Sequence, residues 1–422
     1  MQVQLRLLVS LVALGGLASP AAQATNGYFF HGYGIKAQGQ AGVSIAQPQD
    51  ALAAANNPAG TAWIGDRLDL GATLFAPDRH ASIQGNGADA DGHYNGNARN
   101  LFLIPEFGVS KQLDERFGIG LAVYGNGGMN TDYRRNPYAA FGSRGSAGVD
   151  FSQLFITPSL AYRFGERQSV GIALNVVHQR FASKGLSAFA NPMFSSNPDN
   201  LNDRDHDSSN GVGVRLGWQG QIGDDLTLGL TWASKIKADK FDRYAGLFAD
   251  GGSFDVPENY GAGLSYRLTP RLTLGADVQE IKYGHVRSVA NDFDAQQLFA
   301  GNRFGSESGP GFGWRDITVY KFAASYALTP ALTLRGGYSH AEQPIPGSQT
   351  FLNILAPGVI QDHLSFGLTW SPAPDNELSL AYTHGFEEKV KGDGSIPQTF
   401  GGGEVNLKMS QDIFGLGYAW KF

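Results

Sequence analysis

Cysteine is absent from the 422 residues, so neither a disulfide nor a thiolate metal site is available. Charged residues make up only 17% of the chain, and the net charge of -6 comes without the basic run typical of nucleic-acid binding. The hydrolase motifs H-E-x-x-H and G-x-S-x-G are missing, and the nine histidines are scattered without zinc spacing. The sequence thus predicts no enzyme, no metal or cofactor, and no nucleic-acid partner.

Long apolar runs are missing too. After residue 24, no stretch approaches the ~20 apolar residues of a membrane-spanning helix. A chain without such a helix can cross lipid only as a closed β-barrel, because each backbone N–H and C=O must be paired internally.

The first residues have the features of a secretory signal peptide. Arg6 is positive, residues 7–17 are apolar, and Ala22-Gln23-Ala24 forms an A-x-A cleavage site. We therefore expect an exported protein with a signal peptide at residues 1–24.

The C-terminal ten residues alternate large and small side chains. One face carries Phe414, Leu416, Tyr418, Trp420 and Phe422. A half-buried strand of a soluble protein alternates apolar with polar residues, whereas the other face here is mostly small. This pattern indicates an apolar surround, and a C-terminal Phe on such a strand is similar to the assembly signal of bacterial outer-membrane barrels.

Alternating segments of about 10 residues continue from residue 66 to the end of the chain. Short turns are expected near residues 113–116, 165–168, 223–225, 269–271, 329–331 and 371–376. Long loops are expected near residues 77–98, 126–151, 183–210, 237–257, 286–313, 341–360 and 386–407. Six turns and seven loops leave 14 strands, and this sidedness is typical of a transmembrane barrel. We predict an all-β fold with a 14-stranded antiparallel barrel at residues 66–422.

Strand parity separates two faces of this predicted wall. Aromatic residues near the short turns indicate an interfacial girdle: Tyr162, Phe164, Trp218, Tyr266, Tyr326, Trp370, Tyr418 and Trp420. The opposite parity carries the predicted lumen charges Asp69, Glu106, Arg163, Arg215, Arg267, Asp277, Lys321 and Arg335. An Arg or Lys facing lipid at mid-depth would cost about 2–4 kcal/mol.

A barrel of 14 strands is too wide to be filled by its own side chains. Residues 25–65 are rich in Gly, Ala, Asn and Gln, which suits a plug in a polar lumen. The G-x-G-x-x-A pattern from Gly32 to Ala37 follows no strand, so it does not predict a dinucleotide site. We expect these glycines to allow close backbone packing within the plug.

The N-terminal segment resembles that of the long-chain fatty acid transporter (FadL/TodX) family of outer-membrane channels. The resemblance is carried by Asn26-Gly27-Tyr28, Gly32-Tyr33-Gly34, Asp50 and Asn57-Pro58-Ala59-Gly60. It implies a hatch at residues 25–65, with Asn57, Pro58 and Ala59 near its base. Gly27-Tyr28-Phe29-Phe30 departs from the fatty-acid branch and looks closer to the aromatic-hydrocarbon branch.

This resemblance implies uptake of hydrophobic molecules from outside the cell, with long-chain fatty acids favoured as substrates. The alternatives are aromatic hydrocarbons, or a structural or adhesin barrel that does not transport. We expect a multi-pass, monomeric outer-membrane protein in contact with lipid and lipopolysaccharide.

Two groups of residues are candidates for ligand binding. The third and fourth long loops carry apolar residues that could line a groove: Phe189, Met193, Phe194, Leu247 and Phe248. Packing of loop on loop is the alternative. In the lumen, Arg215, Lys321 and Arg335 could pair with a carboxylate, or lumen acids such as Asp277 and Glu106 could neutralise them.

A side exit through the wall is predicted at the third strand, since each CH2 prefers lipid to water by about 0.8 kcal/mol. Residues 117–124 run into Gly125-Asn126-Gly127-Gly128, the most glycine-dense strand end, and Pro105 removes a donor from the neighbouring strand. The family resemblance implies a kinked third strand that contacts the hatch. An ordinary loop start is the alternative.

One loop has three carboxylates, Asp203, Asp205 and Asp207, at the spacing of a calcium loop. Ser208 and Val214 stand where such a loop needs Gly and Glu. We therefore predict a solvated extracellular loop at this position, without a metal.

Overall fold

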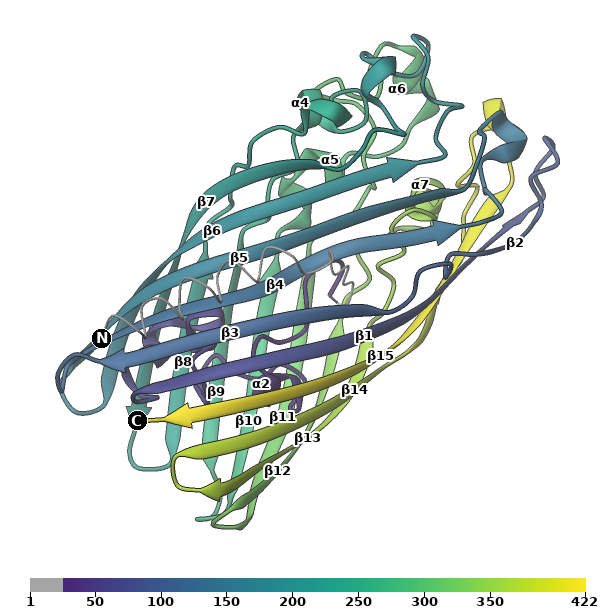
Figure 1. The fold of residues 1–422 in the computed structure, drawn as a ribbon. Helices are drawn as coiled ribbons and strands as arrows, with labels where there is room; N and C mark the ends of the chain where they lie inside the picture. The colour runs from purple at the N-terminus through teal and green to yellow at the C-terminus, as the bar shows by residue number, and fades with distance from the viewer. Residues whose placement is uncertain (1–25) are drawn as a thin grey trace.

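The computed structural model describes residues 26–422, so the predicted signal peptide at residues 1–24 lies outside the described residues. The strands of this part form one antiparallel sheet, and β1 also pairs with β15 (Figure 1). This pairing runs from Arg67↔Lys421 to Gln84↔Glu404 and closes the sheet. The short β2 pairs with the end of β1. The other 14 strands form the wall, and the predicted 14-stranded barrel is confirmed.

Apart from the short β2, the strands are 8 to 18 residues long. They are β1 Arg67–Gln84, β2 Gly92–Asn95, β3 Phe102–Gln112, β4 Phe117–Tyr133, β5 Ala147–Phe164, β6 Gln168–Lys184, β7 Asp207–Ile222, β8 Leu226–Ala233, β9 Asn259–Arg267, β10 Leu272–Ile281, β11 Ile317–Thr329, β12 Leu332–Ala341, β13 Asp362–Ala373, β14 Asn376–Val390 and β15 Glu404–Lys421.

The helices are single turns. They are α2 Ile35–Gln38, α3 Ala53–Asn56, η1 Pro58–Ala62, η2 Ala139–Phe141, η3 Pro198–Asn200, η4 Asp242–Tyr244, α4 Ala249–Gly252, η5 Tyr283–His285, α5 Arg287–Ala290, α6 Ala295–Phe299, η6 Gly347–Gln349, α7 Thr350–Asn353 and η7 Gln398–Phe400. None of the helices in residues 26–422 is long and apolar enough to cross a membrane.

The six short turns lie where the alternation predicts them, but several strands extend far into the predicted long loops. β1 continues to Gln84, β4 to Tyr133 and β14 to Val390, while β15 begins at Glu404. These strand ends carry polar residues on one face. A sequence pattern of this kind cannot be told apart from that of a polar loop. The backbone ladder nevertheless continues, for example from β4 to β5 as far as Tyr133↔Ala147.

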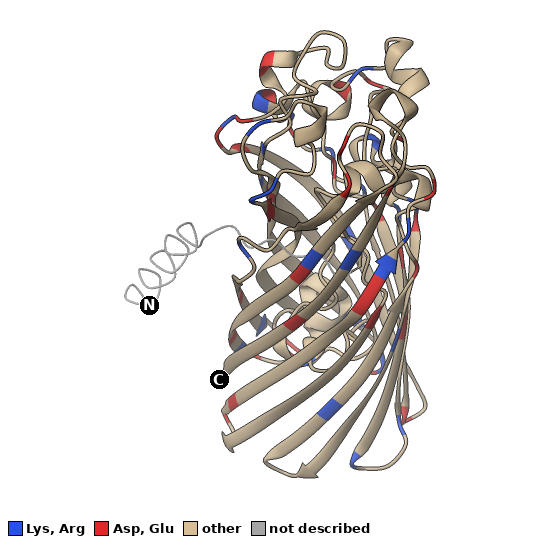
Figure 2. Cartoon of the chain, turned by 90° about the vertical axis from the view of Figure 1, so that its right-hand side faces the viewer, with Lys and Arg blue, Asp and Glu red and all other residues tan. Residues whose placement is uncertain are grey.

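Apolar side chains cover the outside of the wall. Leu230 and Phe366 are more than half exposed, as expected for lipid-facing residues. Trp370 and Trp420 of the predicted aromatic girdle also face outward. Charged residues crowd at the long-loop end and are sparse along the lower wall (Figure 2).

The predicted lumen charges are buried or half-buried with one exception. Arg267 is exposed at the short-turn end, where its Nε donates to Asp225 (3.0 Å). Parity places a residue on a face of the wall, but at a strand end a long side chain reaches bulk water on either face.

Residues 26–65 lie inside the barrel, and nearly all of them are buried. α2 packs against β1, β13, β14 and β15, while η1 packs against β4 to β7 on another side of the wall. The segment thus crosses the lumen and contacts strands that are far apart around the barrel (Figure 1).

Candidate functional site

The Asn57-Pro58-Ala59 turn fixes one end of the N-terminal segment. Asn57 caps η1, since its Oδ1 accepts from the Ala59 N–H (3.1 Å). Its Nδ2 donates to the carbonyl of Ile45 (2.8 Å) and to that of Trp218 in β7 (3.0 Å). The wall comes this close because residue 217 is Gly, where a Cβ would lie 1.9 Å from Asn57 Oδ1.

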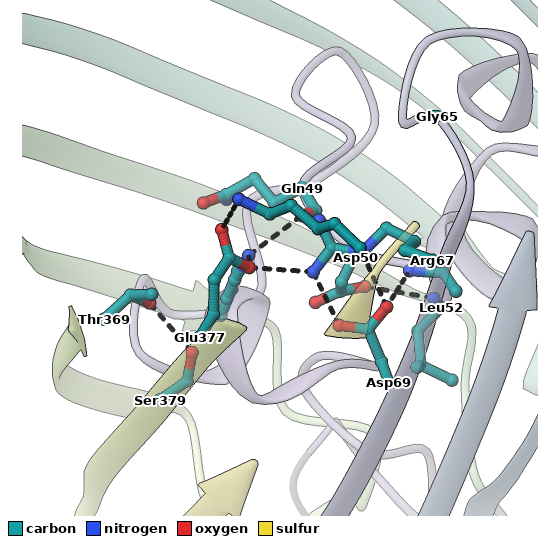
Figure 3. Close-up of polar contacts among 12 residues, drawn as sticks. Gln49, Asp50, Leu52, Gly65, Arg67, Asp69, Thr369, Glu377 and Ser379 are labelled. Carbon is teal, nitrogen blue, oxygen red and sulfur yellow. Dashed lines mark hydrogen bonds and ion pairs between the residues drawn. The ribbon is translucent and has the colours of Figure 1, made fainter. Parts of the chain in front are cut away.

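Buried charges fix the other side of the segment (Figure 3). Lys36 Nζ lies 2.5 Å from Glu377 Oε2 of β14. Arg67 of β1 links Glu377 (2.9 Å) to Asp69 (2.7 Å). Asp69 in turn accepts from the Ala51 N–H (2.9 Å). Breaking a buried pair of this kind by removing one partner costs about 3–5 kcal/mol, so the network holds the segment firmly in place.

Asp50 lies inside this network and accepts from the Leu52 N–H (3.0 Å). Burial raises the pKa of Asp50 to about 6, and the neighbouring Asp69 adds to the increase, while Lys36 and Arg67 oppose it. The folded protein therefore binds a proton at Asp50 more tightly than the unfolded chain does.

The three predicted lumen cations all contact the N-terminal segment. Arg335 donates from Nε to Gln49 (2.9 Å), and Lys321 donates to the carbonyl of His31 (3.1 Å). Arg215 donates from Nη1 to the carbonyl of Asn56 (3.2 Å). The predicted pairing partner Asp277 faces Lys321 across the ladder but accepts from the N–H groups of residues 44 and 45.

Arg215 and Lys321 line a shared cavity of about 20 Å³ together with Phe30 and Tyr33. Arg335 does not line it. The buried Nε–H of Arg215 has no acceptor, and a buried unsatisfied donor is costly. This donor is available to an oxygen of a bound molecule.

At the long-loop end, an apolar cluster surrounds a cavity of about 30 Å³. Phe189, Leu247 and Phe248 line it. Phe194 lies beside it and packs on Phe189, with ring centroids 6.0 Å apart. Met193 does not line this cavity and is 59% exposed.

Loop packing leaves only a small space here. The cavity is far smaller than the ~300–1,000 Å³ of a typical ligand pocket. A molecule that needs a pocket of that size could enter only if the apolar loops moved apart.

The backbone ladder is interrupted between β3 and β4. These strands pair from Phe107↔Val123 to Gln112↔Gly118. In the described chain, residues 102–106 of β3, including Pro105, pair with β1 but have no partner on β4. The wall therefore lacks backbone hydrogen bonds at this seam.

Tyr28 and Phe30 form backbone hydrogen bonds to β4 at this gap. The Phe30 N–H donates to the Asn126 carbonyl (2.9 Å), and the Gly128 N–H donates to the Tyr28 carbonyl (3.0 Å). The close approach requires Gly127, where a Cβ would lie 1.9 Å from the Tyr28 carbonyl oxygen.

The sequence placed Gly125, Gly127 and Gly128 at the end of a strand, and this is wrong. They lie inside β4, which continues to Tyr133, and the register with β5 shifts between Gly125 and Gly127. Glycine here gives a bulge within a strand, because the backbone must bend around the bound segment.

Tyr283, just after β10, is a site residue that sequence reasoning missed. Its hydroxyl oxygen accepts from the N–H groups of Tyr28 and Phe29 (both 3.1 Å), and it donates to the Asn26 carbonyl. Lys36 and Glu377 were missed as well. These partners are 341 residues apart, and a single sequence carries no signal for such a pair.

The family of outer membrane protein transport proteins (OMPP1/FadL/TodX) matches residues 11–422. The chain belongs to this family. The Neisseria meningitidis protein NMB0088 is 21% identical over 98% of both chains. Among solved structures, a Pseudomonas aeruginosa FadL homologue has a TM-score of 0.70 at 16% identity, covering 94% of this chain and 100% of the other. The P. putida toluene transporter TodX has a TM-score of 0.66 at 16% identity, covering 93% and 99%.

Membership of the OMPP1/FadL/TodX family makes the chain an outer-membrane transport channel for hydrophobic compounds. Its strands cross the membrane as a closed barrel. Residues 26–65 lie inside the lumen, so a route through the barrel has to pass them.

Asp50→Asn tests the charge on the segment in this FadL/TodX channel. The cost of the buried carboxylate is absent below pH ~4 and complete above about pH 6, because the folded-state pKa is raised. A difference of about two pKa units is worth roughly 3 kcal/mol. We expect Asp50→Asn to raise the opening free energy of residues 26–62 at pH 7.5, measured by amide hydrogen exchange, and to match wild type near pH 4. Lower protection at pH 7.5 would mean that the charge stabilises the segment through Lys36 and Arg67.

Proposed function

We propose that this channel takes up long-chain fatty acids, which bind at the long loops, pass a hatch formed by residues 26–65, and leave sideways between β3 and β4. The observation that carries the proposal is the interrupted ladder, which the backbone of Tyr28 and Phe30 bridges. Movement of this backbone would open the wall without breaking any bond between neighbouring strands.

The apolar cluster is the proposed capture site. Aromatic rings connect this cluster to the gap between β3 and β4. The ring centroids of Phe248 and Phe254 are 5.0 Å apart, and those of Phe254 and Tyr28 are 6.0 Å apart. A hydrophobic molecule could therefore move along apolar side chains from the loops to the hatch. Removal of its apolar surface from water would provide the favourable free energy for this movement.

A carboxylate head group would meet Arg215 and Lys321 at the hatch. The unsatisfied Nε–H of Arg215 supports this role. Aromatic hydrocarbons are the second candidate, because the apolar cavity at the loops has no charged side chain in its lining. A neutral molecule pays no charge-desolvation free energy in an apolar cavity, whereas burial of an unpaired carboxylate there would be strongly unfavourable.

The side exit is tested by a disulfide across the gap. Pro105→Cys and Gly125→Cys stand two positions beyond the last ladder pair, Phe107↔Val123, and the chain has no other cysteine. We expect oxidation to abolish fatty-acid uptake and reduction to restore it. Leu160→Cys with Ile172→Cys, paired between β5 and β6, is the matched control. Normal uptake by the oxidised 105–125 protein would place the exit elsewhere.

Capture at the loops is tested by Leu247→Ser with Phe248→Ser. Each buried apolar side chain contributes about 1.5–3 kcal/mol, so we expect at least a tenfold loss of affinity for a fluorescent fatty acid. Met193→Ser, at an exposed position in a neighbouring loop, is the control. Unchanged affinity in a folded double variant would leave loop packing as the only role of the cluster.

The head-group role is tested with two ligands. We expect Arg215→Ala with Lys321→Ala to weaken oleate more than an alkane of equal length, because only oleate carries a carboxylate. Arg335→Ala, which alters a hatch contact outside the cavity, should weaken both ligands equally. An equal loss for oleate and alkane in the double variant would favour the neutral substrate class.

A further inference from the structure

A polar cavity of about 360 Å³ lies at the long-loop end of the wall. Asn130 of β4 and Asp150 of β5 are register partners, and Asp150 pairs next with Ala182 of β6. The neighbouring positions Phe151 and Phe181 are buried in the lumen. Since side chains alternate along a strand, Asn130 and Asp150 lie side by side on the outer face, away from the transport route.

Two oxygen atoms in this cavity lack a donor. Asn130 is only 8% exposed, and its Oδ1 has no hydrogen-bond partner. Asp150 Oδ1 has none either, although Asp150 Oδ2 accepts from Arg99 (3.1 Å) and His206 (3.1 Å). Adjacent buried acceptors without a donor need a water molecule or an ion to satisfy them.

The charges around the cavity favour a cation. Carboxylates come from Asp132, Asp150, Asp203 and Asp205, and the permanent cations are Arg99, Lys184 and Arg204. Asp132 is paired with Lys184 (2.9 Å), and Asp150 keeps its second oxygen free. Four carboxylates against three permanent cations give the lining a negative excess, which disfavours a phosphate or another anion.

We propose that this cavity binds a hydrated divalent cation of the Mg²⁺ type, with Asp150 Oδ1 and Asn130 Oδ1 as its protein ligands. Within residues 26–422, no three His, Asp or Glu side chains are spaced to enclose a bare metal ion. Mg²⁺ does not need such a cage, because it keeps several waters and binds through one or two carboxylates. At about 30 Å³ per water, the cavity has room for the hydration shell.

The bound ion would add a link between β4, β5 and the loop before β7, beside the backbone pairs of β4 with β5 and the ion pair of His206 with Asp150. β4 contributes Asn130, β5 contributes Asp150, and Asp203 and Asp205 precede β7 at the rim. The carboxylates of Asp203 and Asp205, which resemble a calcium loop in the sequence, thus line the same cavity as Asn130 and Asp150.

Mn²⁺ is the probe, because it replaces Mg²⁺ and is detected by electron paramagnetic resonance. Full-length protein in detergent, treated with EDTA, should bind one Mn²⁺ per chain in competition with Mg²⁺. We expect Asp150→Asn and Asn130→Ala to weaken binding by at least about tenfold. Asn130→Ala keeps the ion pairs of Asp150 intact, so its effect reports on the site itself. Asp292→Asn, which removes an exposed ion pair with Arg315 at the same end of the barrel, should bind normally.

Two results would overturn the proposal. One is the absence of specific Mn²⁺ binding to folded wild-type protein, which would mean that water alone fills the cavity. The other is equal affinity in wild type, Asp150→Asn and Asn130→Ala, which would place the ion elsewhere.

Discussion

Every backbone N–H and C=O in a lipid-exposed wall needs a partner, and the seam between β3 and β4 is where this wall does not supply one from its own strands. The carbonyl of Tyr28 and the N–H of Phe30 satisfy β4 instead. The wall and the segment inside it are therefore not independent. The hydrogen bonds of Tyr28 and Phe30 complete the backbone pairing of β4 at that seam.

That position depends on contacts far from the seam. Lys36, Arg67 and Glu377 hold one side of the segment through charges, and Asn57 holds the other through its amide. Tyr283 fixes the short stretch at the seam through three hydrogen bonds. The charged contacts are buried, and removing one partner leaves an uncompensated charge. Tyr28 also packs against Phe151, Phe254 and Trp314, with ring centroids 5.9, 6.0 and 6.0 Å apart. Movement of the stretch beside β4 therefore has to separate these apolar contacts as well as the hydrogen bonds.

Much of the barrel could be predicted from the sequence because its physical constraint is periodic. Alternation marks the strands and its breaks mark the short turns, so the strand number and the outward face of residues such as Trp370 follow from one sequence. The strand ends at the long-loop side could not be predicted from the sequence. There the polar residues face water, and their pattern is the same as that of loop residues. The glycines at residues 125–128 indicated an irregular stretch beside the third predicted strand, but not the close approach of the Tyr28 carbonyl to Gly127. Long-range partners such as Lys36 and Glu377 leave no local signal at all.

Amide hydrogen exchange at the seam, measured by NMR with and without saturating oleate or toluene, tests the central claim most directly. If ligand passage moves the segment away from β4, the N–H groups of Phe30 and Gly128 should exchange at least about tenfold faster with ligand bound. The ladder from Phe107↔Val123 downward should keep its protection. Unchanged exchange at Phe30 and Gly128 while ligand is bound would contradict a side exit controlled by this segment.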